Sequence, residues 1–142
     1  MTPALLQHPR LHLDLAGDHA AANRARAATS RFLHEAADRH DHPRNVSPPA
    51  EDAALLIVTE LVTNAVRHTA GPCTLDLALH GERLDIDVTD GSPEHPVTRA
   101  PHVEGTGGWG WILIRHLARE VTVHPTEAGG KTVRARLTVA AA

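Results

Sequence analysis

The chain has 142 residues with a formal net charge of −3 and 42% apolar residues, which suits one domain with a small core. It has no apolar run that could cross a membrane, no signal-peptide-like start and no dense Lys/Arg cluster for nucleic acid, and its single cysteine cannot form an internal disulfide. We therefore expect a cytoplasmic protein with an arm over residues 1–10 and one domain over 11–142. The twelve histidines are scattered, which favours solvated surface histidines over a metal site.

The first half of the chain predicts one strand and two helices. Leucines alternate with polar residues over 11–15, which indicates a strand. Asp18 can cap a following helix, whose apolar stripe consists of Ala21, Ala25, Ala28, Phe32 and Ala36. The polar segment 39–45 predicts a loop. Ser47, with two prolines after it, is typical of the start of a second helix, which runs to about residue 68.

The second half predicts strands and a third helix. Segments 74–80 and 83–90 alternate in polarity, and the glycine that follows the first segment is typical of a hairpin turn. Residues 91–108 contain three prolines and several glycines, so we expect a long loop with a function such as a lid. A helix over about 109–118 and strands near 120–124 and 132–140 complete the chain. These elements predict an α+β fold, a two-layer α/β sandwich with three helices on one face of a mostly antiparallel sheet of about five strands.

The second helix is apolar nearly all round but carries a polar stripe. Glu60 and Asn64 lie one turn apart on the same face, and Arg67 and His68 extend the stripe by another turn. A helix of this kind should be largely buried, where an unpaired carboxylate or amide costs several kcal/mol. The two side chains therefore either hydrogen-bond to a neighbouring loop or belong to a functional site.

Asp90 is the second unusual residue. It is in phase with the apolar positions of its strand, so its carboxylate should point to the packed face. The alternative is a turn residue at the end of the strand.

The third feature is the glycine-rich segment 104–111, which runs into an apolar helix. Glycines let backbone N–H groups approach an anion, and a helix N-terminus adds its positive end, so the segment could cradle a phosphate. It lacks the Gly-Lys-Ser/Thr of a Walker motif, and the hinge of a lid would have the same composition.

In this order the motifs resemble those of the GHKL ATPase superfamily, which includes gyrase B, histidine kinases and MutL. Segment 60–68 is similar to the N box, 90–93 to the first glycine box, 105–111 to the second and 130–133 to the final strand. The short chain is most similar to the anti-sigma-factor serine/threonine kinase branch, and within it to small stand-alone ATP-binding regulators of actinobacteria. The resemblance covers residues 11–139 and implies a Bergerat-type fold that binds ATP and Mg²⁺.

The resemblance also implies roles for the matching residues. Asn64 would hold the Mg²⁺ that bridges the phosphates, and Glu60 would be the catalytic general base that deprotonates the attacking hydroxyl. Asp90 would accept a hydrogen bond from the adenine amino group. The other matches would line the nucleotide site, with Thr132 near the adenine: Arg67, His68, Gly105, Thr106, Gly107, Gly108, Trp109, Gly110 and Thr132.

Two functions stay open at this stage. Retention of Glu60 and Asn64 favours a kinase that transfers the γ-phosphate of ATP to a Ser/Thr of an anti-sigma-factor antagonist and could also sequester a sigma factor. Trp109 and Trp111 stand where relatives commonly have arginine and leucine. They favour instead an ATP-dependent protein-binding module with little or no kinase activity, because exposed aromatic residues suit protein contacts. Both functions are compatible with a homodimer.

Overall fold

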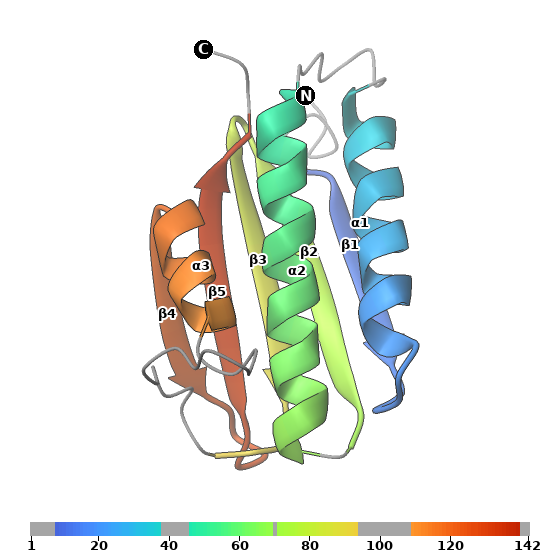
Figure 1. The fold of residues 1–142 in the computed structure, drawn as a ribbon, viewed down its shortest axis with the longest axis vertical. Coiled ribbons are helices and arrows are strands. Elements are labelled where there is room, and N and C mark those ends of the chain that lie inside the picture. Colours follow the sequence, from blue (N-terminus) through green and yellow to red (C-terminus); the bar gives the residue numbers. More distant parts are fainter. Residues whose placement is uncertain (1–7, 38–45, 70, 94–108, 140–142) are drawn as a thin grey trace, which may run out of the picture.

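The computed structural model describes residues 8–37, 46–69, 71–93 and 109–139. Within them the elements follow one another as β1 (Arg10–Leu15), α1 (Ala21–Ala37), α2 (Pro48–Thr69), β2 (Cys73–His80), β3 (Arg83–Asp90), α3 (Trp109–Leu117), β4 (Glu120–Pro125) and β5 (Lys131–Thr138). Figure 1 shows the helices side by side over one face of the sheet. The predicted two-layer α+β sandwich is therefore confirmed.

Within the described residues the sheet has five strands in the order β1-β2-β3-β5-β4, and every neighbouring pair is antiparallel. The predicted β2–β3 hairpin is confirmed. His80 pairs with Arg83 across a two-residue turn, and Gly81 has a φ of 63°, a conformation that glycine adopts without strain. The chain crosses from β3 through α3 to the outer edge and returns to place β5 between β3 and β4. As a result, the end of β3 lies directly beside the start of β5.

Both predicted helix caps are present. A carboxylate oxygen of Asp18 accepts a hydrogen bond from the Ala20 N–H at 3.0 Å, and the Ser47 hydroxyl accepts one from the Ala50 N–H at 3.2 Å. The predicted stripe of α1 is partly wrong, because the fully buried residues in its middle are Thr29 and Leu33 rather than their neighbours. Thr29 can be buried because its hydroxyl donates a hydrogen bond to the Ala25 carbonyl at 2.8 Å.

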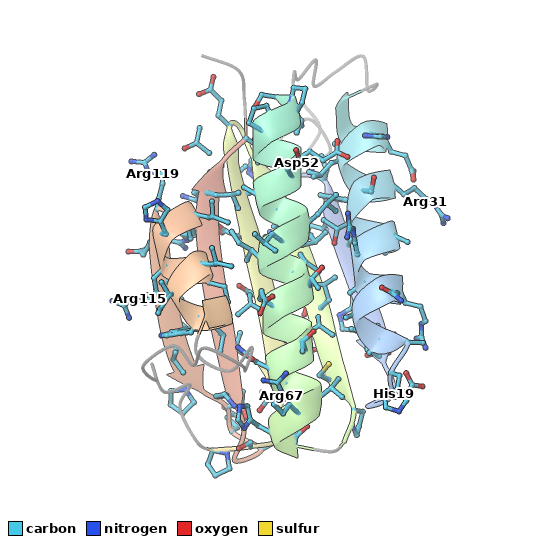
Figure 2. The ribbon with its side chains drawn as sticks, in the orientation of Figure 1. His19, Arg31, Asp52, Arg67, Arg115 and Arg119 are labelled. Atoms are coloured by element: carbon cyan, nitrogen blue, oxygen red, sulfur yellow. The ribbon has the colours of Figure 1, made fainter. Side chains whose placement is uncertain are left out.

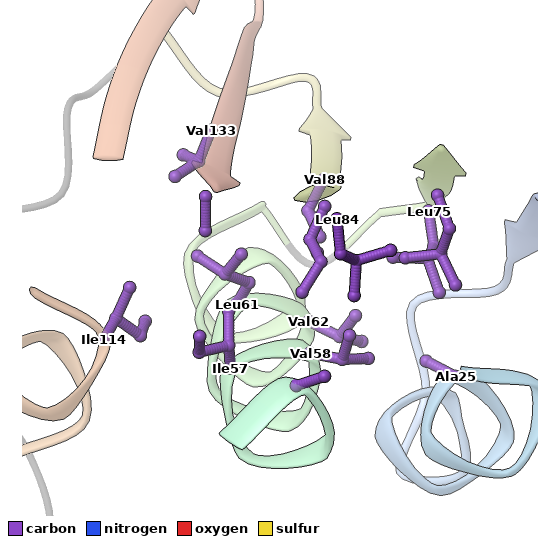
Figure 3. Close-up of a cluster of buried hydrophobic side chains, with 14 of the residues drawn as sticks. Ala25, Ile57, Val58, Leu61, Val62, Leu75, Leu84, Val88, Ile114 and Val133 are labelled. Carbon is purple, nitrogen blue, oxygen red and sulfur yellow. The ribbon is translucent and has the colours of Figure 1, made fainter. Parts of the chain in front are cut away.

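The core lies between α2 and the middle of the sheet. Figure 3 shows α2 side chains such as Ile57, Val58 and Leu61 pointing at the apolar residues of the sheet, with Ile114 of α3 on one flank. These side chains are almost entirely aliphatic, as the low aromatic content requires. α2 is therefore held rigidly against the sheet along most of its length.

The ends of two predicted segments differ from the structure or lie outside it. Pro9 and Arg10, which the predicted arm over residues 1–10 includes, belong to the folded domain: β1 begins at Arg10, and the carbonyl of the buried Pro9 accepts a hydrogen bond from the Leu79 N–H at 3.0 Å. Of the predicted lid over 91–108, only residues 91–93 are among those described. No helix in the described part of the chain is long and apolar enough to span a bilayer.

Candidate functional site

The polar stripe of α2 survives folding. Glu60 and Asn64 are half-buried, although the turns around them are packed into the core. Among the described residues, none makes a hydrogen bond or ion pair with either side chain, so the predicted structural alternative, a hydrogen bond to a neighbouring loop, is not found there. Arg67 and His68 lie in the last turn and are exposed; Figure 2 shows Arg67 near the lower end of α2. The stripe thus offers a carboxylate and an amide that are held in place by the helix.

Asp90 points to the helix-covered face, as its phase in β3 predicts. It ends β3 at the lower edge of the sheet in Figure 1, the same end of the molecule as Arg67. The Lys131 ammonium lies 3.0 Å from both carboxylate oxygens, and the Ser92 N–H donates a hydrogen bond to Oδ1 at 2.9 Å. The two paired side chains are only 4% (Asp90) and 6% (Lys131) exposed. The ion pair is therefore nearly sealed from water.

Removing one partner of such a pair leaves an uncompensated buried charge, which costs about 3–5 kcal/mol. A hydrogen bond between a neutral donor and a charged group contributes about 1.5–3 kcal/mol. A neutral hydrogen-bond donor that approaches Asp90 is therefore too weak to displace the Lys131 ammonium. A ligand that offers only a neutral donor at this position therefore meets the ion pair as a unit.

Lys131 is not among the site residues predicted from the sequence, although the alternation of β5 indicates its position. It is in phase with Val133 and Ala135 of β5, so alternation alone places it on the packed face, as it does for Asp90 in β3. A lysine is almost never buried without a partner, and the facing aspartate provides one.

Cys73 begins β2 on the helix-covered face, where the charge of Asp90 affects its thiol. Burial raises the pKa of the Cys73 thiol, and the carboxylate of Asp90 raises it further.

Thr132 is placed differently from its neighbour Lys131. Its hydroxyl lies 2.7 Å from the Thr89 hydroxyl, and alternation with the buried Val133 puts both threonines on the open face of the sheet. The role near the adenine that the resemblance implies for the Thr132 side chain is therefore not supported by its position.

The open face of the sheet carries a second set of charges in a depression of about 550 Å³. Arg134 makes a bidentate ion pair with Asp87 at 2.8 and 2.9 Å, and the Nε atoms of Arg83 and Arg136 each lie 3.2 Å from Asp85 Oδ1. None of the predicted site residues that the structure describes lines this depression. Among the described residues, no cluster of three or more His, Cys, Asp or Glu could hold a metal ion.

The family is decided by a sequence comparison. Residues 19–137 match the family model of the histidine kinase-like ATPase domain. The chain belongs to this family. The resemblance to the GHKL superfamily, which contains the histidine kinases, is thereby confirmed for this ATPase-family chain. No curated protein matches it significantly.

Solved structures also resemble this ATPase-family chain, among them structures of two bacterial proteins. One contains the RsbU and RsbW domains of a Mycobacterium tuberculosis protein, with 22% identity and a TM-score of 0.66 over 94% of this chain and 33% of the other. The chain thus spans a third of that protein, and the likeness shows a shared fold. The other is the histidine kinase domain of the E. coli osmosensor EnvZ, with 20% identity and a TM-score of 0.44 over 65% of this chain and 67% of that one.

The glycine-rich segment of this ATPase-family chain is only partly described. Gly105, Thr106, Gly107 and Gly108 lie outside the described residues, as do the side chain of Trp109 and the surroundings of Gly110. α3 begins at Trp109, where the sequence predicts a helix. Trp111 is 7% exposed and belongs to the core cluster. The expectation that both tryptophans are exposed is therefore wrong for Trp111, because the helical spacing of α3 turns this side chain toward the core.

Proposed function

We propose that this domain is an ATP-dependent serine/threonine protein kinase whose substrate is an anti-sigma-factor antagonist. The observation that carries the proposal is the pair Glu60 and Asn64. Both are half-buried on a rigid helix, and both lack a partner among the described residues. A fold can tolerate such groups when a ligand completes their hydrogen bonds. Family membership makes ATP the ligand class to test first.

Asn64 is a suitable ligand for Mg²⁺. Its amide oxygen is a hard, neutral donor, and Mg²⁺ is usually held by one or two protein oxygens together with substrate phosphates. When bound, Mg²⁺ would neutralise charge that develops on the transferred phosphoryl group. The half-burial of Asn64 limits competing water, and its place next to the buried Ala65 of a packed helix fixes the direction of the side chain.

Glu60 would act as the general base. It lies one turn before Asn64 on the same helix face, so its carboxylate can accept the proton of a serine or threonine hydroxyl that approaches the γ-phosphate. The attacking hydroxyl comes from another protein, so this part of the site has to be reachable from outside. Arg67 and His68 are exposed at the end of the same stripe and are available to the phosphates or to the partner.

The partner class rests on the resemblance of the motifs to anti-sigma-factor kinases and on the fold shared with a protein that contains an RsbW domain. In this role the domain would act in the cytoplasm, phosphorylate the antagonist and thereby regulate transcription, with or without sequestering a sigma factor itself. The alternative, a binding module without phosphoryl transfer, rested on two exposed tryptophans. The burial of Trp111 removes one of them.

The test is transfer of label from γ-³²P-ATP, with Mg²⁺, to antagonist-like proteins encoded near this one. Glu60→Gln should keep ATP affinity and lower the transfer rate by about 10²–10⁴-fold, the usual effect of losing a general base. Asn64→Ala should weaken Mg²⁺-dependent ATP binding. Asp52→Asn is the matched control, because Asp52 is an exposed acid near the other end of α2 (Figure 2). Wild-type rates in Glu60→Gln would contradict the assignment of the base, and ATP binding without any transfer would support the binding module.

A further inference from the structure

We propose that Lys131 reads the nucleotide base together with Asp90. The Lys131 ammonium stays on the carboxylate and donates a hydrogen bond to N1 of adenine, while Asp90 accepts one from the adjacent N6 amino group. This inference rests on the proposed ATP site and adds to it a specificity-determining residue.

All three donors of the ammonium have an acceptor, and one of these contacts is weak. Its three N–H groups face two carboxylate oxygens of Asp90 at 3.0 Å and the Ser92 carbonyl at 3.4 Å. The contact to the carbonyl is longer than a normal N–H···O hydrogen bond of 2.7–3.2 Å, so it is the weakest of the three. The N–H that points toward the Ser92 carbonyl can therefore turn to a base acceptor without loss of the ion pair.

Asp90 likewise keeps an acceptor position. A carboxylate has about four lone-pair sites on its two oxygens. Oδ1 receives Lys131 and the Ser92 N–H, whereas Oδ2 receives Lys131 alone among these contacts. Oδ2 can therefore accept a hydrogen bond from an amino group while both existing partners stay in place.

The pair matches one edge of adenine. The Watson–Crick edge presents an amino donor next to the N1 acceptor, and proteins recognise this edge by hydrogen bonds. An acceptor and a donor that lie side by side are complementary to it. Here the carboxylate and the ammonium lie 3.0 Å apart on neighbouring strands and are nearly sealed from water. Since a neutral amino group is too weak to displace the ammonium, the base has to meet both groups together.

The backbone fixes the two groups relative to each other. Gly130 packs so closely against the end of β3 that a Cβ there would overlap the Asp90 carbonyl oxygen and lie 2.9 Å from Gly91 Cα. The residue after Gly130 is Lys131, so the start of β5 cannot slide away from Asp90 without breaking this contact. The donor and the acceptor are thus placed by packed backbone, and the flexibility of the lysine side chain is limited by its burial.

The test compares the binding of Mg²⁺–ATP and Mg²⁺–1-deaza-ATP, in which a C–H replaces N1, by calorimetry on the full chain. The wild type should bind ATP about 10–100-fold more tightly, the range expected for a hydrogen bond to a charged group. Lys131→Met should bind both nucleotides equally, while Lys131→Arg should restore part of the preference. Arg134→Met is the matched control, because it removes an ion pair between the same two strands on the opposite face and should leave the preference unchanged.

The outcomes separate this inference from the proposed function. Equal wild-type affinity for the two nucleotides would overturn the contact to N1 and leave the ATP site standing. A Lys131→Met variant that weakens both nucleotides in the same proportion would show a structural role only, and one that binds ATP more tightly would show that the lysine competes with the base; either overturns the inference. Failure of the wild type to bind either nucleotide would overturn both proposals. If Lys131→Met does not fold, the affinities of the wild type and of Lys131→Arg for ATP and 1-deaza-ATP still test the contact to N1.

Discussion

Replacing Gly130 with alanine is predicted to damage the end of the sheet that holds the candidate site. The new Cβ would overlap the Asp90 carbonyl oxygen and lie 2.9 Å from Gly91 Cα and 3.0 Å from the Asp90 carbonyl carbon. All three atoms belong to the backbone, so no side chain can rotate away to make room. The first residue of β5 and the last residue of β3 would have to separate, and this movement stretches the 3.0 Å ion pair between Lys131 and Asp90.

The expected cost is that of overpacking, about 1–3 kcal/mol, and it rises to about 3–5 kcal/mol if the buried ion pair breaks. For a domain of this length each kcal/mol lowers the Tm by about 4 °C, so Gly130→Ala should melt at least about 4–12 °C below the wild type. The assay is thermal unfolding followed by circular dichroism.

Gly91→Ala is the matched control for this experiment. Gly91 lies beside the same site, but a Cβ there would meet nothing within 4 Å, so its Tm should stay close to the wild-type value. A Gly130→Ala variant that melts no lower than Gly91→Ala would refute the reasoning, since it would show that β3 and β5 do not approach as closely as the structure places them.

Three further predictions concern titrating groups. The hydrogen bond to Asp76 raises the pKa of His12. The stability that protonated His12 contributes is therefore complete below pH 6.5 and is lost as the pH rises through the raised pKa. His12→Asn should lower the Tm at pH 5.5 and leave it unchanged at pH 9. Burial lowers the pKa of His80, so protonation opposes folding below pH 6.5; His80→Gln should therefore gain Tm relative to the wild type at pH 5 and show no such gain at pH 8. Burial and the Asp90 charge raise the pKa of the Cys73 thiol. Iodoacetamide should therefore label the folded chain far more slowly than the urea-unfolded chain at pH 7.4, as measured by mass spectrometry. Equal labelling rates would contradict the burial of the thiol.

Local patterns in the sequence were enough to predict the elements. Alternating leucines, a glycine at a two-residue turn and capping side chains such as Asp18 and Ser47 act within a few residues, and each was found in the predicted place. The inward direction of Asp90 follows from the same alternation. Such patterns depend on short-range geometry, so they need no knowledge of what lies across the sheet.

The partners of the site residues were decided only by the tertiary structure. Asp90 and Lys131 are 41 residues apart, and they meet because β5 enters the sheet between β3 and β4 in one particular register. Alternation predicts which face a side chain takes, but strand order and register fix its neighbour, and these arise from the packing of the whole core. The sequence by itself determined that Glu60, Asn64 and Asp90 are polar residues at packed positions, and the fold determined which side chains lie next to them.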